Sequence, residues 1–193
     1  RHFLEQCLFS LSTAMAGIDG EVIVIDNCSD DDSLTYLEPK FPGVRFILNV
    51  GNEGFARANN RALEQASGKY VLFLNPDTLV PEDCLRICLN RMKEDVQVGA
   101  LGVKMIDGSG LFLRESKRAF PSPATSFFKL TGLSSLFPRS RWFARYHLGH
   151  LPAGEDHEVD VLAGAFMMIR KDVLDAVGSF DETFFMYGED IDL

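Results

Sequence analysis

Short apolar runs alternate with amphipathic stretches along the first half of the chain, and this alternation constrains the fold more than any other feature. The runs at 22–25, 44–48 and 70–74 are rich in β-branched, aliphatic and aromatic residues, as strands covered on both faces are. Apolar residues at three- and four-residue spacing predict helices over 3–15 and 55–66. Because strands that alternate with helices form parallel sheets, we predict an α/β fold with a parallel, doubly wound sheet.

The second half continues this pattern on either side of an irregular segment. A helix that starts at Pro81, strands over 98–105 and 159–169, and a short helix over 171–177 are expected. Residues 107–158 instead mix Ser, Pro, Gly, aromatic and basic residues without a steady period. So long a weakly patterned stretch inside a compact domain is typical of a functional flap.

Polar residues follow three of the predicted strands directly. Asp26 and Asn27 follow the first strand, residues 49–60 begin after the second, and Asn75-Pro76-Asp77 follows the third. Ligands bind beyond the carboxyl ends of the strands in open parallel sheets, so these residues are expected to form one site. Asp77 can reach a hard cation that also takes phosphate oxygens. The alternative is a plain turn, which Asn, Pro and Asp equally favour.

Two further loops were compared with known ligand-binding patterns. The acid-rich residues 26–33 are not an EF-hand calcium loop, because Asp31 occupies the position that needs Gly and Leu37 the position that needs Glu. Residues 51–54 lie between a strand and a helix, where backbone N–H groups can meet an anion. They do not form a G-x-G-x-x-G motif, so dinucleotide binding has weak support.

Three acidic residues lie together near the end of the sequence, within 189–192, after an aromatic run. Aromatic neighbours can desolvate a carboxylate and raise its pKa toward the range of a general base. A solvated first turn of a helix, where acids are favourable, is the alternative.

Charge and cysteine content limit the class of partner. Lys and Arg number 19 against 28 Asp and Glu, so the net charge of −9 disfavours nucleic acid. Surplus carboxylates fit a divalent cation that mediates contact with a phosphate compound, although they also serve solubility. The four cysteines form no Cys-x-x-Cys pair, which argues against a zinc site or a disulfide framework and favours a reducing, cytoplasmic compartment.

Taken together, four segments resemble a family of enzymes. Residues 24–31 are similar to a V-D-N-x-S-x-D motif, residues 49–60 to an N-x-G-x-x-x-x-N motif, residues 74–78 to a D-x-D element, and residues 164–193 to an acceptor-side end. These motifs, in this order, are those of the family-2, inverting, nucleotide-sugar-dependent glycosyltransferases with the GT-A fold, in their rhamnosyltransferase-like branch. The resemblance covers the chain apart from its middle flap.

The resemblance implies a role for each matching residue. It places at the donor Asp26, Asn27, Asn52, Gly54, Arg57, Asn60 and Asn75. Asp26 would contact the nucleotide base, and the residues from Asn52 to Asn60 would shape the donor pocket. Asp77 matches the last acid of D-x-D and would bind Mg²⁺ or Mn²⁺ held by the donor diphosphate. Asp190 matches the general base, with Glu189 beside it as a supporting or acceptor-binding group.

The implied reaction moves a sugar from dTDP-rhamnose or a UDP-sugar to a hydroxyl of a saccharide or lipid-linked acceptor, with inversion and metal assistance. The setting would be assembly of bacterial surface polysaccharide in the cytoplasm, at the inner face of the plasma membrane, with peripheral membrane association of the full-length protein. Flap residues Trp142, Phe143 and Tyr146 would contact the acceptor or, alternatively, form the small core of the flap.

Two rival functions remain open from the sequence. A sugar-nucleotide nucleotidylyltransferase would need a Gly-rich basic loop after a first strand that this chain does not contain. A non-catalytic nucleotide- or glycan-binding module is disfavoured by the retention of Asp77 and Asp190. We expect one GT-A catalytic domain over 1–193, with a nucleotide-sugar-binding part at 1–106, the flap at 107–158 and an acceptor-side part at 159–193. The family's first strand and C-terminal end would lie outside it.

Overall fold

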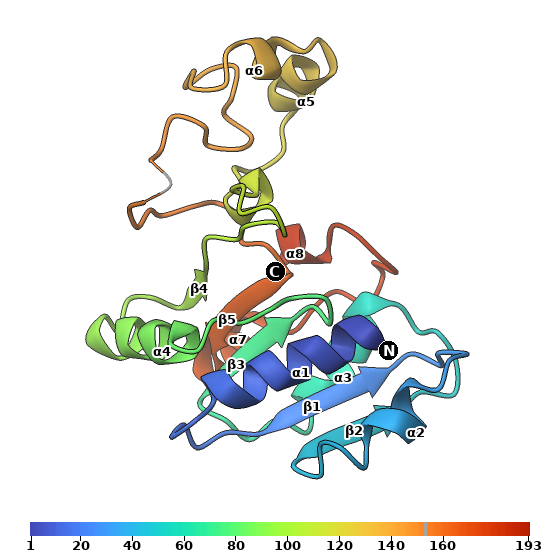
Figure 1. Ribbon diagram of the computed structural model, residues 1–193. Helices are drawn as coiled ribbons and strands as arrows, with labels where there is room; N and C mark the ends of the chain where they lie inside the picture. Colours follow the sequence, from blue (N-terminus) through green and yellow to red (C-terminus); the bar gives the residue numbers. More distant parts are fainter. Residues whose placement is uncertain (153) are drawn as a thin grey trace. The chain divides into compact units, whose positions relative to one another are not determined.

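The chain folds into two compact units (Figure 1). The computed structural model describes residues 1–152 and 154–193. Residues 1–101 and 164–193 form the first unit, and residues 102–163 form the second. All residues that the resemblance places at the donor, the metal and the general base lie in the first unit, whereas the whole of the expected flap, 107–158, lies inside the second.

The strands form a parallel pair and a separate three-stranded sheet. β1 (Val22–Asp26) pairs in parallel with β2 (Val44–Leu48). β3 (Tyr70–Leu74) pairs with β5 (Phe166–Arg170), and the order of this second sheet is β3-β5-β4, where β4 is Ala100–Gly102. The α/β fold class is confirmed. The sequence pattern did not reveal that β5 runs antiparallel to β3, nor that it begins only at Phe166.

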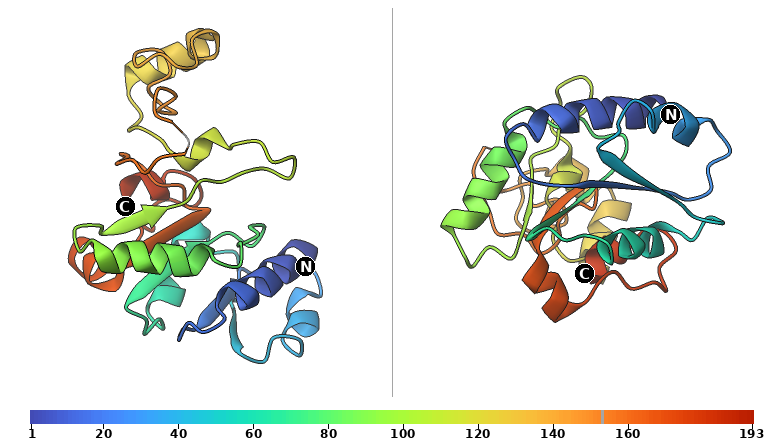
Figure 2. Two further views of the ribbon diagram at one scale, coloured as in Figure 1. Left: turned by 60° about the vertical axis from the view of Figure 1, so that its left-hand side comes forward. Right: turned by 90° about the horizontal axis from the view of Figure 1, so that it is seen from below.

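Helices flank these strands. They are α1 (His2–Ala14), α2 (Ser33–Leu37), α3 (Phe55–Leu63), α4 (Cys84–Glu94), α7 (Lys171–Val177) and α8 (Glu189–Asp192). The right-hand view of Figure 2 shows α1 and α3 on opposite sides of β1. The alternating side chains of β1 explain this, since Val22 and Val24 face Leu8 of α1 and Leu37 of α2 in one apolar cluster.

Buried Arg170 ties β5 to the end of α4. Its guanidinium donates hydrogen bonds to backbone carbonyls of Met92, Asp95 (3.1 Å) and Val98 (2.8 Å), all at or just beyond the C-terminal turn of α4. A helix C-terminus carries partial negative charge and unpaired carbonyls, so it accommodates a buried cation that would otherwise be costly. Apart from Arg170, β5 consists of apolar residues, and all five of its residues are buried, as expected for the middle strand of its sheet.

The second unit has more regular structure than the irregular sequence pattern predicts. It contains a 3₁₀ turn (η1, Arg114–Ser116), α5 (Pro123–Leu130) and α6 (Leu133–Leu136). Phe143 packs edge-on against Phe128, with ring centroids 5.1 Å apart. Trp142, in contrast, is 79% exposed. Phe143 therefore belongs to a small aromatic core of this unit and Trp142 does not.

Candidate active site

The end of β1 fixes the first candidate residue. Asp26 is the last residue of β1, and its backbone carbonyl accepts a hydrogen bond from the Asn49 amide at 2.8 Å. Its carboxylate accepts hydrogen bonds from the backbone amide of Ser29, at 3.3 and 3.4 Å to the two oxygens, and from the Ser29 hydroxyl. Cys28, inside this turn, has a φ of 63°. The turn thus holds the carboxylate at the carboxyl end of the parallel pair.

A chain of amides links this end of β1 to the loop before α3. Asn27 Nδ2 donates to the Gly54 carbonyl at 3.0 Å, and Asn49 Nδ2 donates to Asn27 Oδ1 at 2.7 Å. Arg61 in turn donates to Asn49 Oδ1. Asn49 is 1% exposed, and sequence reasoning gave it no role. The available signal was its position directly after β2, opposite the end of β1, where a buried amide needs partners.

Gly54 is required by a close approach between two loops. Its φ is +84° and its ψ 177°, and a Cβ placed on it would lie 2.5 Å from the Phe185 carbonyl oxygen. That same carbonyl accepts a hydrogen bond from the Phe55 amide at 2.9 Å. Asn52 supports the turn, because its Oδ1 accepts the Gly54 amide at 3.1 Å. The segment before α8 is therefore seated on the N-terminus of α3.

Asn60 and Arg57 bind the same segment further along. The Asn60 amide is buried and makes a reciprocal pair with Phe180, donating to its carbonyl at 2.9 Å and accepting its amide at 3.1 Å. It also donates to Glu182 Oε1 at 3.1 Å, while Arg57 Nε lies 3.3 Å from Glu182 Oε2. The Arg57–Glu182 pair is more than half exposed and contributes little stability. The structure thus shows both α3 residues in contact with residues 180–182.

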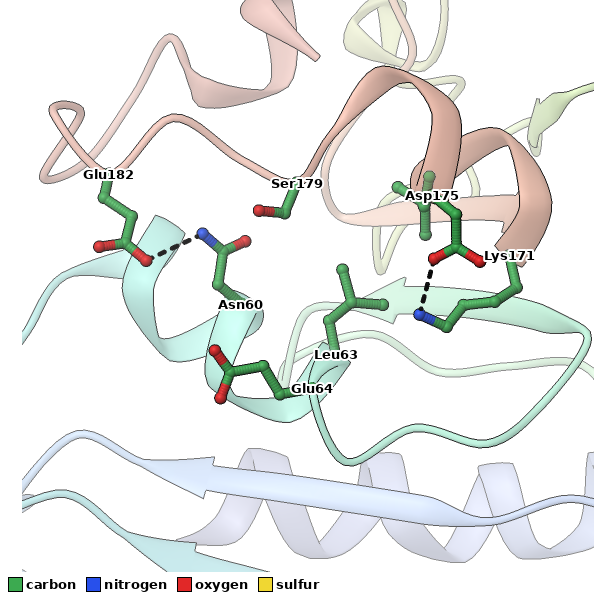
Figure 3. Close-up of a pocket in the computed structure, with 8 residues that line it drawn as sticks. Asn60, Leu63, Glu64, Lys171, Asp175, Ser179 and Glu182 are labelled. Atoms are coloured by element: carbon green, nitrogen blue, oxygen red, sulfur yellow. Dashed lines mark hydrogen bonds and ion pairs between the residues drawn. The ribbon is translucent and has the colours of Figure 1, made fainter.

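A pocket lies beside Asn60 (Figure 3). It has a volume of about 250 Å³ and lies between the end of α3 and α7, where the Lys171 ammonium and the Asp175 carboxylate form an ion pair of 3.1 Å. Neither Asp77 nor Asp190 lines it. The pocket therefore does not contain the predicted general base or the predicted metal ligand.

The turn after β3 presents an exposed carboxylate. The Asn75 amide donates to the Ala165 carbonyl at 3.0 Å, and the Thr78 hydroxyl donates to the same carbonyl at 3.4 Å. Asp77, between them, is exposed. Burial, and after it the negative charge of Asp77, raise the pKa of the nearby Cys7 thiol to about 11. A carboxylate in this position is free to meet a ligand beyond the end of the sheet.

The second acidic candidate, Asp190, is held by Gly164, the residue before Ala165. The Gly164 amide donates to Asp190 Oδ2 at 3.3 Å. Glu189, the first residue of α8, is 7% exposed, and its Oε2 has no hydrogen-bond partner among the described residues. Leaving a buried carboxylate oxygen without a hydrogen-bond partner is energetically costly. The 164–165 segment therefore holds Asp190 on one residue and the Asn75–Thr78 turn on the next.

Within residues 1–152 and 154–193, no group of three or more His, Cys, Asp and Glu side chains is arranged to hold a metal ion. A self-sufficient protein cage for a metal is thus absent from this part of the chain. A lone exposed carboxylate such as Asp77 fits a different arrangement, in which Mg²⁺ or Mn²⁺ takes one or two protein carboxylates and the oxygens of a bound diphosphate.

The chain matches the family described as Glycosyl transferase family 2 over residues 1–178. A curated relative, the N-acetylglucosaminyl-diphospho-decaprenol L-rhamnosyltransferase of Mycobacterium tuberculosis, is 29% identical over 98% of this chain. The chain spans 64% of that relative's length.

Solved structures show the same fold. Residues 1–349 of S. aureus TarS align with a TM-score of 0.63 and 22% identity, over 98% of this chain and 49% of that fragment. The mannosyltransferase PcManGT of Pyrobaculum calidifontis, in complex with GDP-Man and Mn²⁺, aligns with a TM-score of 0.61 and 19% identity, over 97% of this chain and 45% of PcManGT.

Proposed function

The chain belongs to glycosyl transferase family 2, and we propose that it is an inverting glycosyltransferase that moves a sugar from a nucleoside diphosphate to a hydroxyl group of a saccharide or lipid-linked acceptor. The observation that carries this proposal is the 164–165 segment. Gly164 of this segment binds Asp190, the neighbour of buried Glu189, and Ala165 binds both sides of the turn that bears Asp77. An acid for the acceptor and an acid for the donor's cation are the two parts that such a transfer needs.

The donor half would lie across the ends of β1 and β3. Asp26, held by the Ser29 turn, would contact the nucleotide base with Asn27 beside it. Asn52, Gly54, Arg57 and Asn60 would shape the pocket through the loops they fix, since their observed contacts run to the Gly54 turn and to residues 180–185. dTDP-rhamnose or a UDP-sugar is the proposed donor, in keeping with the rhamnosyltransferase relative.

Asp77 would bind Mg²⁺ or Mn²⁺ together with the donor diphosphate, with Asn75 at the position of the other D-x-D acid. Such an ion neutralises the charge that grows on the departing nucleoside diphosphate. The Mn²⁺ bound to PcManGT supports a divalent ion in this fold. Asn75 is positioned by the hydrogen bond from its backbone amide to the Ala165 carbonyl.

Asp190 would act as general base. It would take the proton from the acceptor hydroxyl as that oxygen attacks the anomeric carbon of the donor sugar. The transition state of this transfer has oxocarbenium character. The Gly164 amide donates to Asp190 Oδ2 and helps to orient the carboxylate. Glu189, with its unpaired oxygen, would accept a hydrogen bond from a second acceptor hydroxyl.

A lipid-linked acceptor is supported by the decaprenol-linked substrate in the mycobacterial relative's name. We place the reaction in bacterial surface polysaccharide assembly, in the cytoplasm at the inner face of the plasma membrane. No helix in the described part of the chain is both long enough and apolar enough to span a bilayer.

Incubation with UDP- and dTDP-sugars plus Mn²⁺ tests the proposal against its rivals. We expect nucleotide sugars to raise the melting temperature and water to hydrolyse them slowly in the absence of acceptor. Binding without any hydrolysis favours a non-catalytic module. Formation of nucleotide sugar from a sugar phosphate and a nucleoside triphosphate would instead identify a nucleotidylyltransferase.

Asp77→Ala is expected to remove the metal-dependent part of donor binding. A charge-assisted contact to the ion is lost, so donor affinity with Mn²⁺ should fall at least tenfold, by about 1.5–3 kcal/mol. Titration calorimetry with and without Mn²⁺ measures this. Glu82→Ala removes an exposed acid a few residues away and serves as the matched control. Equal donor affinity in Asp77→Ala and wild type, with and without metal, would contradict the assignment.

A further inference from the structure

One long stretch of the chain contains no acidic residue. Residues 116–154 include six Lys and Arg and neither Asp nor Glu, whereas the other residues carry 13 Lys and Arg against 28 Asp and Glu. A protein with a net charge of −9 thus concentrates positive charge in one segment. This segment lies entirely within the second unit. Such separation of charge favours a negatively charged partner for this segment.

The same segment exposes large apolar side chains. In the hairpin made by α5 and α6, which pack side by side (Figure 1), Phe127 is 58% exposed, Leu130 88% and Leu136 70%. Trp142, just after the hairpin, is 79% exposed. The aromatic core of this unit is made by Phe128 and Phe143, and Phe127 contacts it only at its edge, with ring centroids 5.9 Å from Phe128. Several large apolar side chains that a fold leaves exposed in one short segment favour an interaction site there.

Basic side chains flank these apolar residues. Arg139, Arg141 and Arg145 are all exposed, and they follow α6 within a single turn region that also carries Trp142. We call the exposed residues Phe127, Leu130, Leu136, Phe137, Arg139, Arg141, Trp142 and Arg145 the hairpin surface. It combines apolar anchors and cations in one short segment.

We propose that the hairpin surface docks the protein on a bilayer of anionic phospholipid. Leucine and phenylalanine side chains enter the acyl boundary, tryptophan sits at the headgroup level, and arginine holds its charge among lipid phosphates. Charge complementarity selects this occupant, because the surface has no acidic residue to repel anionic lipid. Two exposed leucines distinguish it from a nucleic-acid surface, which uses aromatic rings for stacking and has little use for aliphatic chains.

This inference deepens the proposed function by naming the membrane as a partner, since a lipid-linked acceptor would lie in the same bilayer. Its test needs no turnover. Binding of the 193-residue chain to vesicles is measured by sedimentation, with phosphatidylcholine alone and with phosphatidylcholine mixed with phosphatidylglycerol. Trp142 is the only tryptophan of the chain, so its emission reports on the hairpin surface directly. We expect binding to the anionic vesicles, weakened by salt, with a blue shift of tryptophan emission.

Charge and apolar variants distinguish docking through the hairpin surface from nonspecific attraction of the whole chain to the vesicles. Each basic residue near an anionic surface contributes about fivefold to affinity, so Arg139→Glu with Arg141→Glu should weaken binding at least about thirtyfold. Arg86→Glu with Lys93→Glu, two exposed residues of α4, changes the net charge equally and should leave binding nearly unchanged. Leu130→Ser with Leu136→Ser should weaken binding by more than about tenfold. Ile87→Ser with Val96→Ser, also exposed, is the apolar control.

Absence of vesicle binding, or equal loss in the α4 control, overturns the proposal and leaves an acidic protein surface as the alternative partner. Thermal stabilisation by nucleotide sugars is measured on the same samples. Vesicle binding without nucleotide binding would contradict the proposed transferase and leave docking intact. Nucleotide binding without vesicle binding would contradict docking and leave the proposed transferase intact.

Discussion

Asp190→Asn is expected to abolish sugar transfer while leaving nucleotide-sugar binding nearly intact. The amide has the shape of the carboxylate and retains an oxygen for the Gly164 amide, so the position of α8 should not change. It cannot take a proton from the acceptor hydroxyl, and removal of a general base lowers rates by about 10²- to 10⁴-fold. Turnover of the donor, with acceptor or with water, measures the loss, and calorimetry measures the donor Kd.

Asp192→Asn is the matched control for this variant. Asp192 is an exposed acid on the same helix, two residues further along, so its replacement changes the local charge equally. We expect normal turnover in Asp192→Asn. Normal turnover in Asp190→Asn would mean that another group takes the proton, and loss of donor binding in Asp190→Asn would mean that the residue shapes the donor pocket instead.

The sequence pattern predicted strand positions better than strand direction. β2 and β3 lie at 44–48 and 70–74, as the apolar runs predict, because a buried strand needs an unbroken apolar segment. The antiparallel direction of β5 was not predicted. Its residues are buried on both faces in either direction, so the pattern contains no signal for direction.

The partners of the candidate site residues were not predictable from the sequence. Resemblance placed Asn60 in a donor pocket, and local sequence gave it no other role. Its amide is in fact occupied by Phe180, a residue 120 positions away, and such a contact depends on how α3 packs against the segment before α8. The same applies to Gly54, whose neighbour is Phe185. Periodicity reports which face of an element is buried and leaves open what it is buried against.

The aromatic residues after the hairpin also have positions that the sequence alone does not predict. The sequence left Trp142 and Phe143 with two alternatives, an acceptor surface or a small core. The structure divides them, since Phe143 packs on Phe128 and Trp142 is exposed. Adjacent residues point in different directions on an irregular backbone, and composition cannot assign those directions.

Gly54→Ala is expected to destabilise the first unit and to remove activity together with stability. At φ +84° and ψ 177° the backbone adopts a conformation that is essentially restricted to glycine, which costs an alanine about 1–3 kcal/mol. The added methyl group would also lie 2.5 Å from the Phe185 carbonyl oxygen. A total loss of about 3 kcal/mol corresponds to a fall in melting temperature of roughly 6–12 °C for a domain of this size.

The expected loss of activity follows from the position of α8, which comes directly after the displaced segment. The Phe55–Phe185 hydrogen bond seats residues 180–188 on α3, and α8 with Glu189 and Asp190 begins directly afterwards. A shift of this segment by 1 Å is enough to misplace a general base and lower turnover about a hundredfold. Hydrolysis of the donor below the melting transition measures this effect apart from unfolding.

Gly51→Ala is the matched control, because no heavy atom of the described residues outside its chain neighbours lies within 4 Å of a Cβ at Gly51, and its φ is not in the left-handed region. We expect wild-type melting and turnover from it. A double variant, Gly54→Ala with Phe185→Ala, locates the clash. Removing the Phe185 ring relieves the contact with its Cδ2 at 2.9 Å but not that with the backbone oxygen, so the double variant should not recover. Full recovery would show that the ring, and not the backbone, requires glycine at this position.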